Sequence, residues 1–121
     1  QPDAALATLA WAADNAGEDE YRAIARLRAA GLLLDKKQYE QALAQLDSAA
    51  QGKSAKAFET LLADRRGDVL LAQGKKDEAR KAYEKALELK PGDIYIQQNY
   101  DLFREADDKR NRKSRKKKAQ P

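Results

Sequence analysis

The chain has 121 residues and a mass of 13.5 kDa, the size of one ordinary domain or of about three to four short helical repeats. It contains no cysteine and no histidine, which excludes a disulfide framework, a thiolate metal site and the commonest general base. The net charge of +4 is the sum of two regions of opposite net charge. Eight of the ten residues from Lys109 to Lys118 are basic, and the rest of the chain carries 16 basic against 20 acidic residues, a net charge of −4.

Apolar residues recur at helical spacing in six stretches. The spacing predicts helices over Asp3–Asp14, Asp19–Leu34, Tyr39–Ala50, Ala55–Gln73, Lys76–Leu89 and from Asp93 onward. No stretch alternates apolar and polar residues as a strand would, so we expect an all-α fold. The basic run lacks apolar residues and cannot form a core, which predicts a folded domain over residues 1–108 and a disordered tail over residues 109–121.

Two segments of the chain resemble each other at an offset of 37 residues. Each reads as an apolar helix, a short basic turn and a second helix with an early alanine. The corresponding pairs are Ala42 and Ala79, Leu46 and Tyr83, and Ala49 and Ala86. Paired short helices that recur every ~34 to 37 residues are typical of helical-hairpin repeats.

The second copy resembles the tetratricopeptide repeat (TPR) family. Counted from Thr60, the positions for a small residue, alanine, an aromatic residue, alanine and proline hold Gly67, Ala79, Tyr83, Ala86 and Pro91. The resemblance implies stacked α-hairpins, in which small residues allow close approach and the aromatic residue fills the space between hairpins. The helix that begins at Asp93 has Asp101 at the close-packing position. We therefore expect it to be a capping helix on which no further helix packs.

A closer resemblance covers residues 4–87. The segments YRAIARLRAAGLLLDKKQYEQALAQLD and LLADRRGDVLLAQGKKDEARKAYEKAL are similar to one TPR subfamily, the YfgM-like ancillary subunit of the bacterial Sec translocon. This implies a domain on the periplasmic face of the inner membrane that interacts with proteins around the translocon; without the resemblance we would place the chain in the cytoplasm. From Lys90 onward the sequence is similar to the terminal helix of a different TPR protein, so a chimeric or engineered scaffold stays open as an alternative.

TPR proteins bind peptides in a groove lined by the first helix of each hairpin. The resemblance places seven candidate contact residues in that groove: Arg28, Leu34, Asp64, Arg65, Asp68, Tyr95 and Asn99. Leu27 and Gly31 occupy the positions where a terminal-carboxylate clamp would have lysine and asparagine. We therefore expect a protein or peptide partner held by apolar and charged contacts. Two alternatives stay open: the chain's own helices fill the groove, or the chain forms a homodimer.

No set of residues has the spacing of a nucleophile, a base and a charge stabiliser. Asp64 and Asp68 lie four apart and fit an acid pair or a metal site, but Arg65 and Arg66 between them favour a solvated charged face. We therefore predict a non-catalytic protein-interaction module with no cofactor, no metal site and no small-molecule substrate.

The basic tail offers a second function. Its cations are Lys109, Arg110, Arg112, Lys113, Arg115, Lys116, Lys117 and Lys118. They could bind nucleic acid or an anionic membrane through counterion release, although no aromatic side chain is present to stack on bases. The alternatives are a solubilising end, or a positive end that favours the dipole of the last helix.

Overall fold

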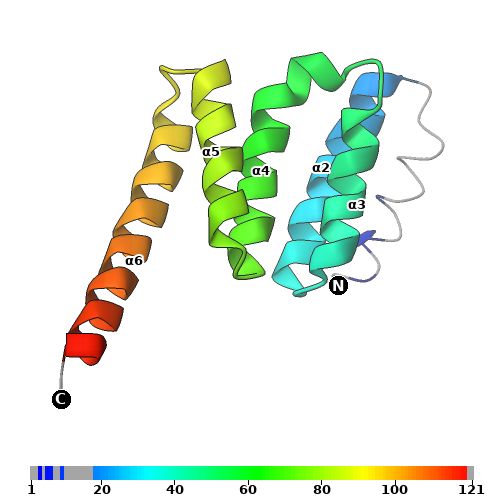
Figure 1. Cartoon of the computed structure of the whole chain (residues 1–121). Coiled ribbons are helices and arrows are strands. Elements are labelled where there is room, and N and C mark those ends of the chain that lie inside the picture. The colour runs from blue at the N-terminus through cyan, green and yellow to red at the C-terminus, as the bar shows by residue number, and fades with distance from the viewer. Residues whose placement is uncertain (1–2, 4, 7–8, 10–17, 120–121) are drawn as a thin grey trace.

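The computed structural model describes residues 18–119 together with Asp3, Ala5, Leu6 and Leu9. Within these residues the elements are α2 (Asp19–Asp35), α3 (Tyr39–Ala50), the 3-10 turn η1 (Ala55–Phe58), α4 (Glu59–Ala72), α5 (Lys76–Leu89) and α6 (Ile94–Ala119), with no strand (Figure 1). The all-α prediction is confirmed. The helix predicted over Asp3–Asp14 falls mostly outside the described residues.

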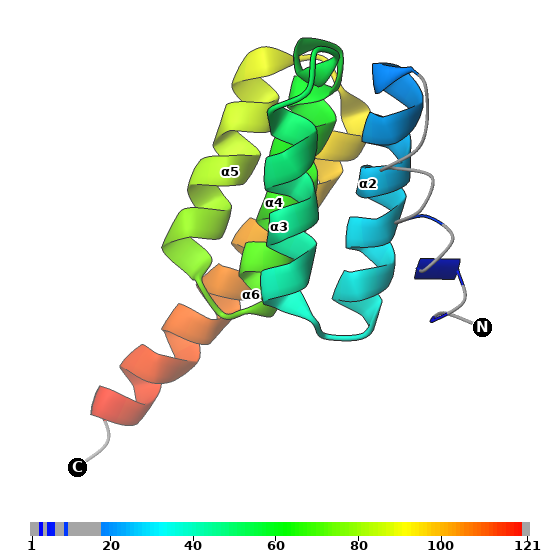
Figure 2. The same cartoon turned by 90° about the vertical axis from the view of Figure 1, so that its right-hand side faces the viewer.

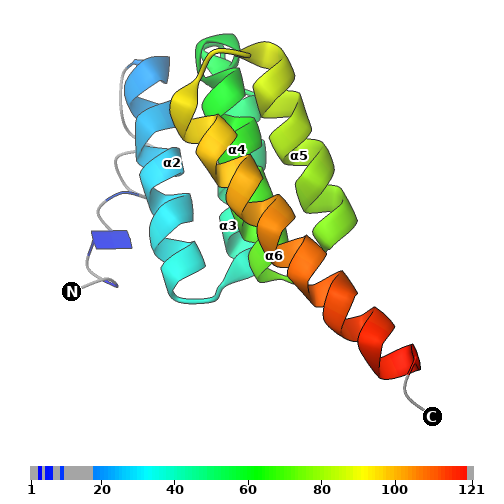
Figure 3. The same cartoon turned by 90° about the vertical axis from the view of Figure 1, so that its left-hand side faces the viewer.

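The helices form two antiparallel hairpins and a terminal helix. Hairpin α2/α3 lies beside hairpin α4/α5, and α6 runs along the outer side of the second hairpin (Figure 1). The first helix of each hairpin shares one layer with α6, while α3 and α5 form the opposite layer (Figures 2 and 3). This is the arrangement that the 37-residue offset predicts.

The two hairpin turns repeat the same backbone geometry. Lys37 and Gly74, 37 residues apart, both have a left-handed backbone, with φ of 61° and 81°. In each turn this residue donates a 2.9 Å backbone hydrogen bond to the helix before it, Lys37 to Leu34 and Gly74 to Leu71. Only the second turn has the glycine that this conformation favours.

Each hairpin is closed by one large side chain opposite a small one. In the first hairpin this pair is Leu46, which is fully buried, and Ala30. In the second, the Tyr83 ring lies so close to Gly67 that a Cβ on Gly67 would be 2.7 Å from two ring carbons. The larger aromatic ring therefore requires glycine where the first hairpin has alanine.

The terminal helix α6 packs mainly on the second hairpin. Its buried residues include Ile96, which contacts Ala86, and Phe103, whose ring lies 5.7 Å from that of Tyr83. Asp93 caps the helix, because its Oδ1 accepts the Ile96 amide at 3.1 Å. Asp101 is exposed to solvent. Among the described residues no helix packs on the outer side of α6.

Two boundaries differ from prediction. The helix predicted to begin at Ala55 begins at Glu59, because residues 55–58 form a 3-10 turn that sets Phe58 against the first core cluster. The tail predicted to be disordered from residue 109 instead continues α6 to Ala119. Lysine and arginine are good helix formers, no proline or glycine interrupts the run, and cations near a helix C-terminus favour its dipole.

Candidate functional site

A large hollow in the described part of the chain lies between α2 and α4. It has a volume of about 920 Å³ and is lined mainly by apolar side chains, with charged residues at its edges. Its lining residues are Ala5, Leu9, Ile24, Leu27, Arg28, Gly31, Leu32, Leu34, Asp35, Phe58, Leu61, Arg65 and Asp68. Ala5 and Leu9, two of the described residues before α2, line part of its wall.

A second hollow of about 580 Å³ adjoins the first, between α4 and the start of α6. It shares Phe58, Leu61 and Arg65 with the first hollow and adds residues from α6. Its other lining residues are Ala57, Thr60, Asp64, Lys90, Asp93, Tyr95, Ile96, Gln98 and Asn99. The two hollows thus adjoin each other across α2, α4 and α6, and we call them together the groove.

All seven residues predicted for a binding groove line these hollows. Four line the first hollow: Arg28, Leu34, Arg65 and Asp68. Asp64, Tyr95 and Asn99 line the second, together with Arg65. They come together because positions 37 residues apart fall at equivalent places on the first helices of the two hairpins, and α6 extends that layer.

The groove exposes apolar side chains that a folded protein ordinarily covers. Leu61, shared by both hollows, is 39% exposed, and Tyr95 at the outer edge is 79% exposed. Tyr100, five residues later, is instead half-buried against Phe103, and its hydroxyl donates to Glu84 at 3.0 Å. The division of the two tyrosines between groove and core agrees with the helical periodicity of α6.

The carboxylate of Asp64 forms part of the floor of the groove and is buried, contrary to the solvated face that its arginine neighbours suggested. Asn99 on α6 donates a 3.3 Å hydrogen bond to each of its oxygens. Burial raises the pKa of Asp64, and the nearby charge of Asp68 raises it further, while the Asn99 hydrogen bond opposes the shift. Asp64 therefore links α4 to α6 as well as lining the groove.

Asp68 joins the groove to the core of the second hairpin. It accepts a 2.6 Å hydrogen bond from the Tyr83 hydroxyl and forms a 3.6 Å ion pair with Arg65. Burial and this hydrogen bond raise the pKa of Tyr83, which keeps the phenol neutral. Both carboxylates thus have structural partners. Within the described part of the chain no group of three or more acidic, histidine or cysteine side chains could hold a metal ion.

Comparison with known proteins identifies the family. Residues 1–102 match the tetratricopeptide repeat-like domain. The chain belongs to this family. The TPR-like domain is also 38% identical over 91 residues to an ancillary SecYEG translocon subunit of Neisseria gonorrhoeae (strain ATCC 700825 / FA 1090). That match covers 75% of this chain and 42% of the relative, so the chain spans about two fifths of the relative's length.

The family and the relative identify this TPR-like domain as a protein-interaction scaffold and favour a non-catalytic role. No helix in the described part of the chain is both long enough and apolar enough to cross a membrane.

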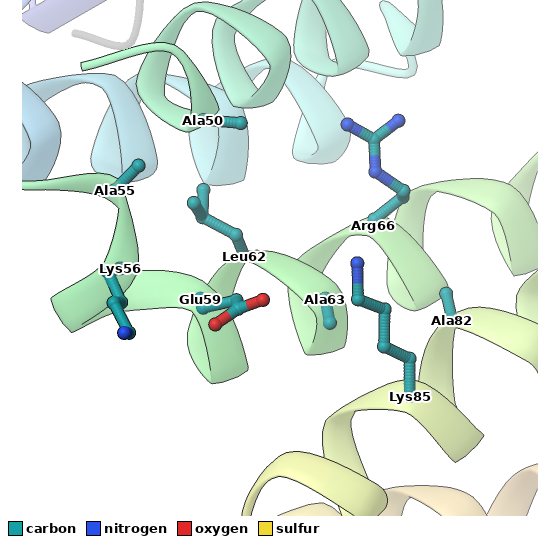
Figure 4. A pocket seen from close by; sticks show the side chains of 9 residues that line it. All are labelled: Ala50, Ala55, Lys56, Glu59, Leu62, Ala63, Arg66, Ala82 and Lys85. Carbon is teal, nitrogen blue, oxygen red and sulfur yellow. The ribbon is translucent and has the colours of Figure 1, made fainter. Parts of the chain in front are cut away.

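Sequence reasoning missed two features of this surface. Phe58 lines both hollows because the 3-10 turn rotates it there, which helical periodicity from Ala55 could not predict. A separate hollow of about 480 Å³ opens on the opposite side of α4, over Leu62 and Ala63 (Figure 4). It borders the long α3–α4 loop, so the extra residues of the 37-residue spacing are the signal that could have found it. Its edge includes Arg66 and Lys85.

Proposed function

We propose that this TPR-like domain binds a segment of a partner protein in the groove, and that the partner belongs to the SecYEG translocon or is bound to it. The observation that carries the proposal is that the two hollows of the groove adjoin and share Phe58, Leu61 and Arg65. Two adjoining hollows present exposed Leu61 and Tyr95 together with charged groups at their edges. Apolar anchors within a polar rim are the usual composition of a protein-binding surface.

The chemistry of the groove suits a protein segment better than a small polar molecule. The first hollow is open and about 920 Å³ in volume, and its floor includes Leu27, Leu34 and Phe58. Arg28 on its edge is exposed and available to a carboxylate of the partner. Apolar side chains of a bound segment would fill the floor, while backbone and acidic groups would meet the edge.

The translocon part of the proposal is supported by the relative. The Neisseria gonorrhoeae protein is an ancillary subunit of SecYEG, and its similarity covers three quarters of this chain. Both hairpins lie within residues 1–102, which match the family, and on this similarity we extend the association with SecYEG to this chain.

The experiment measures binding of the full chain to purified SecYEG in lipid nanodiscs at ~0.3 M salt. Two variants remove groove anchors, Leu61→Gln and Tyr95→Ala. Matched controls change residues of the same type and similar exposure outside both hollows. Leu89→Gln alters a leucine that is also 39% exposed, and Tyr21→Ala alters a tyrosine that is 63% exposed.

We expect each groove variant to weaken binding by about tenfold or more, as for an interface anchor, and the controls to bind as the unmodified chain does. Equal binding by all variants would show that the groove is not the contact. Absence of binding by the unmodified chain would refute the translocon assignment. The groove can then be tested separately by the same four variants against peptides selected from a displayed library.

A further inference from the structure

The C-terminal half of α6 projects past the two hairpins (Figures 1 and 3). Near the point where it leaves the hairpins, Asp107 pairs with Arg80 at 2.9 Å and with Lys76 at 3.5 Å on α5. From residue 109 to residue 116 every side chain is exposed. Asp107 thus fixes the direction in which the projecting half leaves the domain.

The exposed stripe of α6 changes chemistry along its length. Residues seven apart on an α-helix stay on nearly the same face, drifting by only ~20° per step. On α6 such a series is Tyr95, Leu102, Lys109 and Lys116. Tyr95 lines the groove, Leu102 is 65% exposed, and the two lysines follow on the projecting half. The groove therefore continues into a basic surface without a change of face.

Neighbouring cations broaden this basic surface. At ~100° per residue, Arg112 and Lys113 fall on the same side as Lys109 and Lys116, whereas Arg110, seven residues after Phe103, follows the packed stripe. The opposite side continues the packed stripe of Phe103 and Asp107 and holds Asn111 and Ser114, the only uncharged residues between 109 and 116. The positive charge is thus concentrated on the side that faces the same way as the groove, which we call the basic face.

We propose that the groove and the basic face form one extended site for a partner segment in which apolar residues are followed by an acidic run. This rests on the proposed function and specifies the chemistry of the partner. The apolar part occupies the hollows beside Leu61 and Tyr95, and the acidic part lies along the basic face. Glu105 borders the stripe, the other exposed acidic residues of that stretch, Asp101 and Asp108, lie to one side of it, and Asp107 lies on the packed side.

The helix fixes the spacing that such a partner needs. Tyr95 and Lys109 are separated by 14 residues, or about 21 Å at 1.5 Å per residue. An extended chain covers that distance with about six residues, and a helical segment with about fourteen. Ligands of this site should therefore show an acidic run at one of these two distances from their apolar residues.

The experiment selects 20-residue peptides from a displayed random library against the full chain and measures the selected peptides on defined variants. The triple variant K109Q/K113Q/K116Q removes three charges from the basic face. The matched control K53Q/K81Q/K85Q removes three exposed lysine charges elsewhere. A rearranged variant, N111K/K113N/S114K/K116S, keeps composition and net charge and moves two cations to the opposite side.

We expect selected peptides to carry the acidic run and to bind the basic-face variant about 5- to 100-fold more weakly, from roughly 0.3–1 kcal/mol per exposed ion pair. The rearranged variant should also bind more weakly, and the matched control should not. Peptides that need Leu61 and Tyr95 but lack acidic runs would overturn this inference and leave the proposed function standing. Selection of no peptide, or of peptides that depend on neither anchor, would refute the groove itself.

Other polyanions provide the remaining test. A 20-base-pair DNA duplex and phosphatidylglycerol vesicles are titrated against the peptide complex at ~0.15 M salt. We expect the duplex and the vesicles to compete only weakly. Each should displace the bound peptide only at more than ten times the concentration at which free peptide displaces it. Tighter binding of the duplex or of the vesicles than of the best peptide would assign the basic face to nucleic acid or to an anionic membrane and overturn the inference.

Discussion

The contact between Gly67 and Tyr83 determines how the second hairpin closes, and Gly67→Ala tests it. The added Cβ would lie 2.7 Å from Tyr83 Cδ1 and Cε1 and 2.9 Å from Cζ, whereas ordinary contacts begin near 3.4 Å. The ring is 2% exposed, packs against Phe103 and donates a hydrogen bond to Asp68, so it has little room to move. Overpacking of this kind costs about 1–3 kcal/mol.

Helix propensity acts in the opposite direction and sets the net effect. Replacing a helical glycine by alanine gains about 1 kcal/mol. We therefore expect Gly67→Ala to lower the free energy of unfolding by up to about 2 kcal/mol, measured by urea unfolding followed by circular dichroism. The control is Gly31→Ala on α2, where no heavy atom lies within 4 Å of the added Cβ. There the propensity gain stands alone, and stability should rise by about 0.5–1 kcal/mol.

A transplant of residues from the first hairpin tests the cause. The variant G67A/D68G/Y83L gives the second hairpin the residues that Ala30, Gly31 and Leu46 provide in the first. Its loss of stability should be smaller than the sum of the three single changes by more than about 0.5 kcal/mol, because the large ring and the small residue are then changed together. The reasoning is refuted if Gly67→Ala stabilises the protein as Gly31→Ala does, or if the transplant is additive.

Two further predictions concern the turns and the floor of the groove. Gly74→Ala is expected to cost about 1 kcal/mol in thermal or urea unfolding because φ is 81°, while Lys37→Gly in the equivalent turn should stabilise by a smaller amount. Burial raises the pKa of Asp64 above its ordinary value of 3.8, so between 3.8 and the raised pKa the folded chain binds more protons than the unfolded chain. The stability contributed by Asp64 is therefore present at low pH and lost as pH rises through the raised pKa. Asp64→Asn should remove that decline in urea unfolding between pH 4 and 7, whereas Asp77→Asn, at a side chain that is 90% exposed, should leave it unchanged.

The sequence predicts the second helix of each hairpin well and the start of α4 less well. The bounds of α3 and α5 agree with prediction because strong local signals flank both helices: basic turns before them, and Gly52 or Pro91 soon after them. The beginning of α4 depends on how the Phe58 side chain packs against the core of the preceding hairpin. That contact is made by tertiary packing, which the periodicity of residues 55–73 does not contain.

In the candidate site, too, features set by the repeat pattern were predictable, and features set by contacts between distant residues were not. A resemblance to TPR repeats placed seven residues on one surface, because the repeat fixes which positions of each first helix face it. The burial of Asp64 was not predictable from its neighbours. It depends on Asn99, which is 35 residues away and belongs to the capping helix. The charged neighbours of Asp64 therefore predicted an exposed side chain, whereas in the structure Asp64 accepts a hydrogen bond from Asn99 on another helix.

One pair of repeat positions differs in chemistry between the two hairpins and α6. The first hairpin has Ala30 followed by Gly31, and the second has Gly67 followed by Asp68. In both, the first residue is small enough for a second helix to close over it. The terminal helix has Asp101 and Leu102 there, and no helix in the described part of the chain covers either. Asp101 opposes addition of another hairpin because burying an unpaired carboxylate is costly, while Leu102 stays exposed between the groove and the basic face. Asp101, which disfavours a further packed helix, and Leu102, which lies exposed between the groove and the basic face, are thus adjacent on α6.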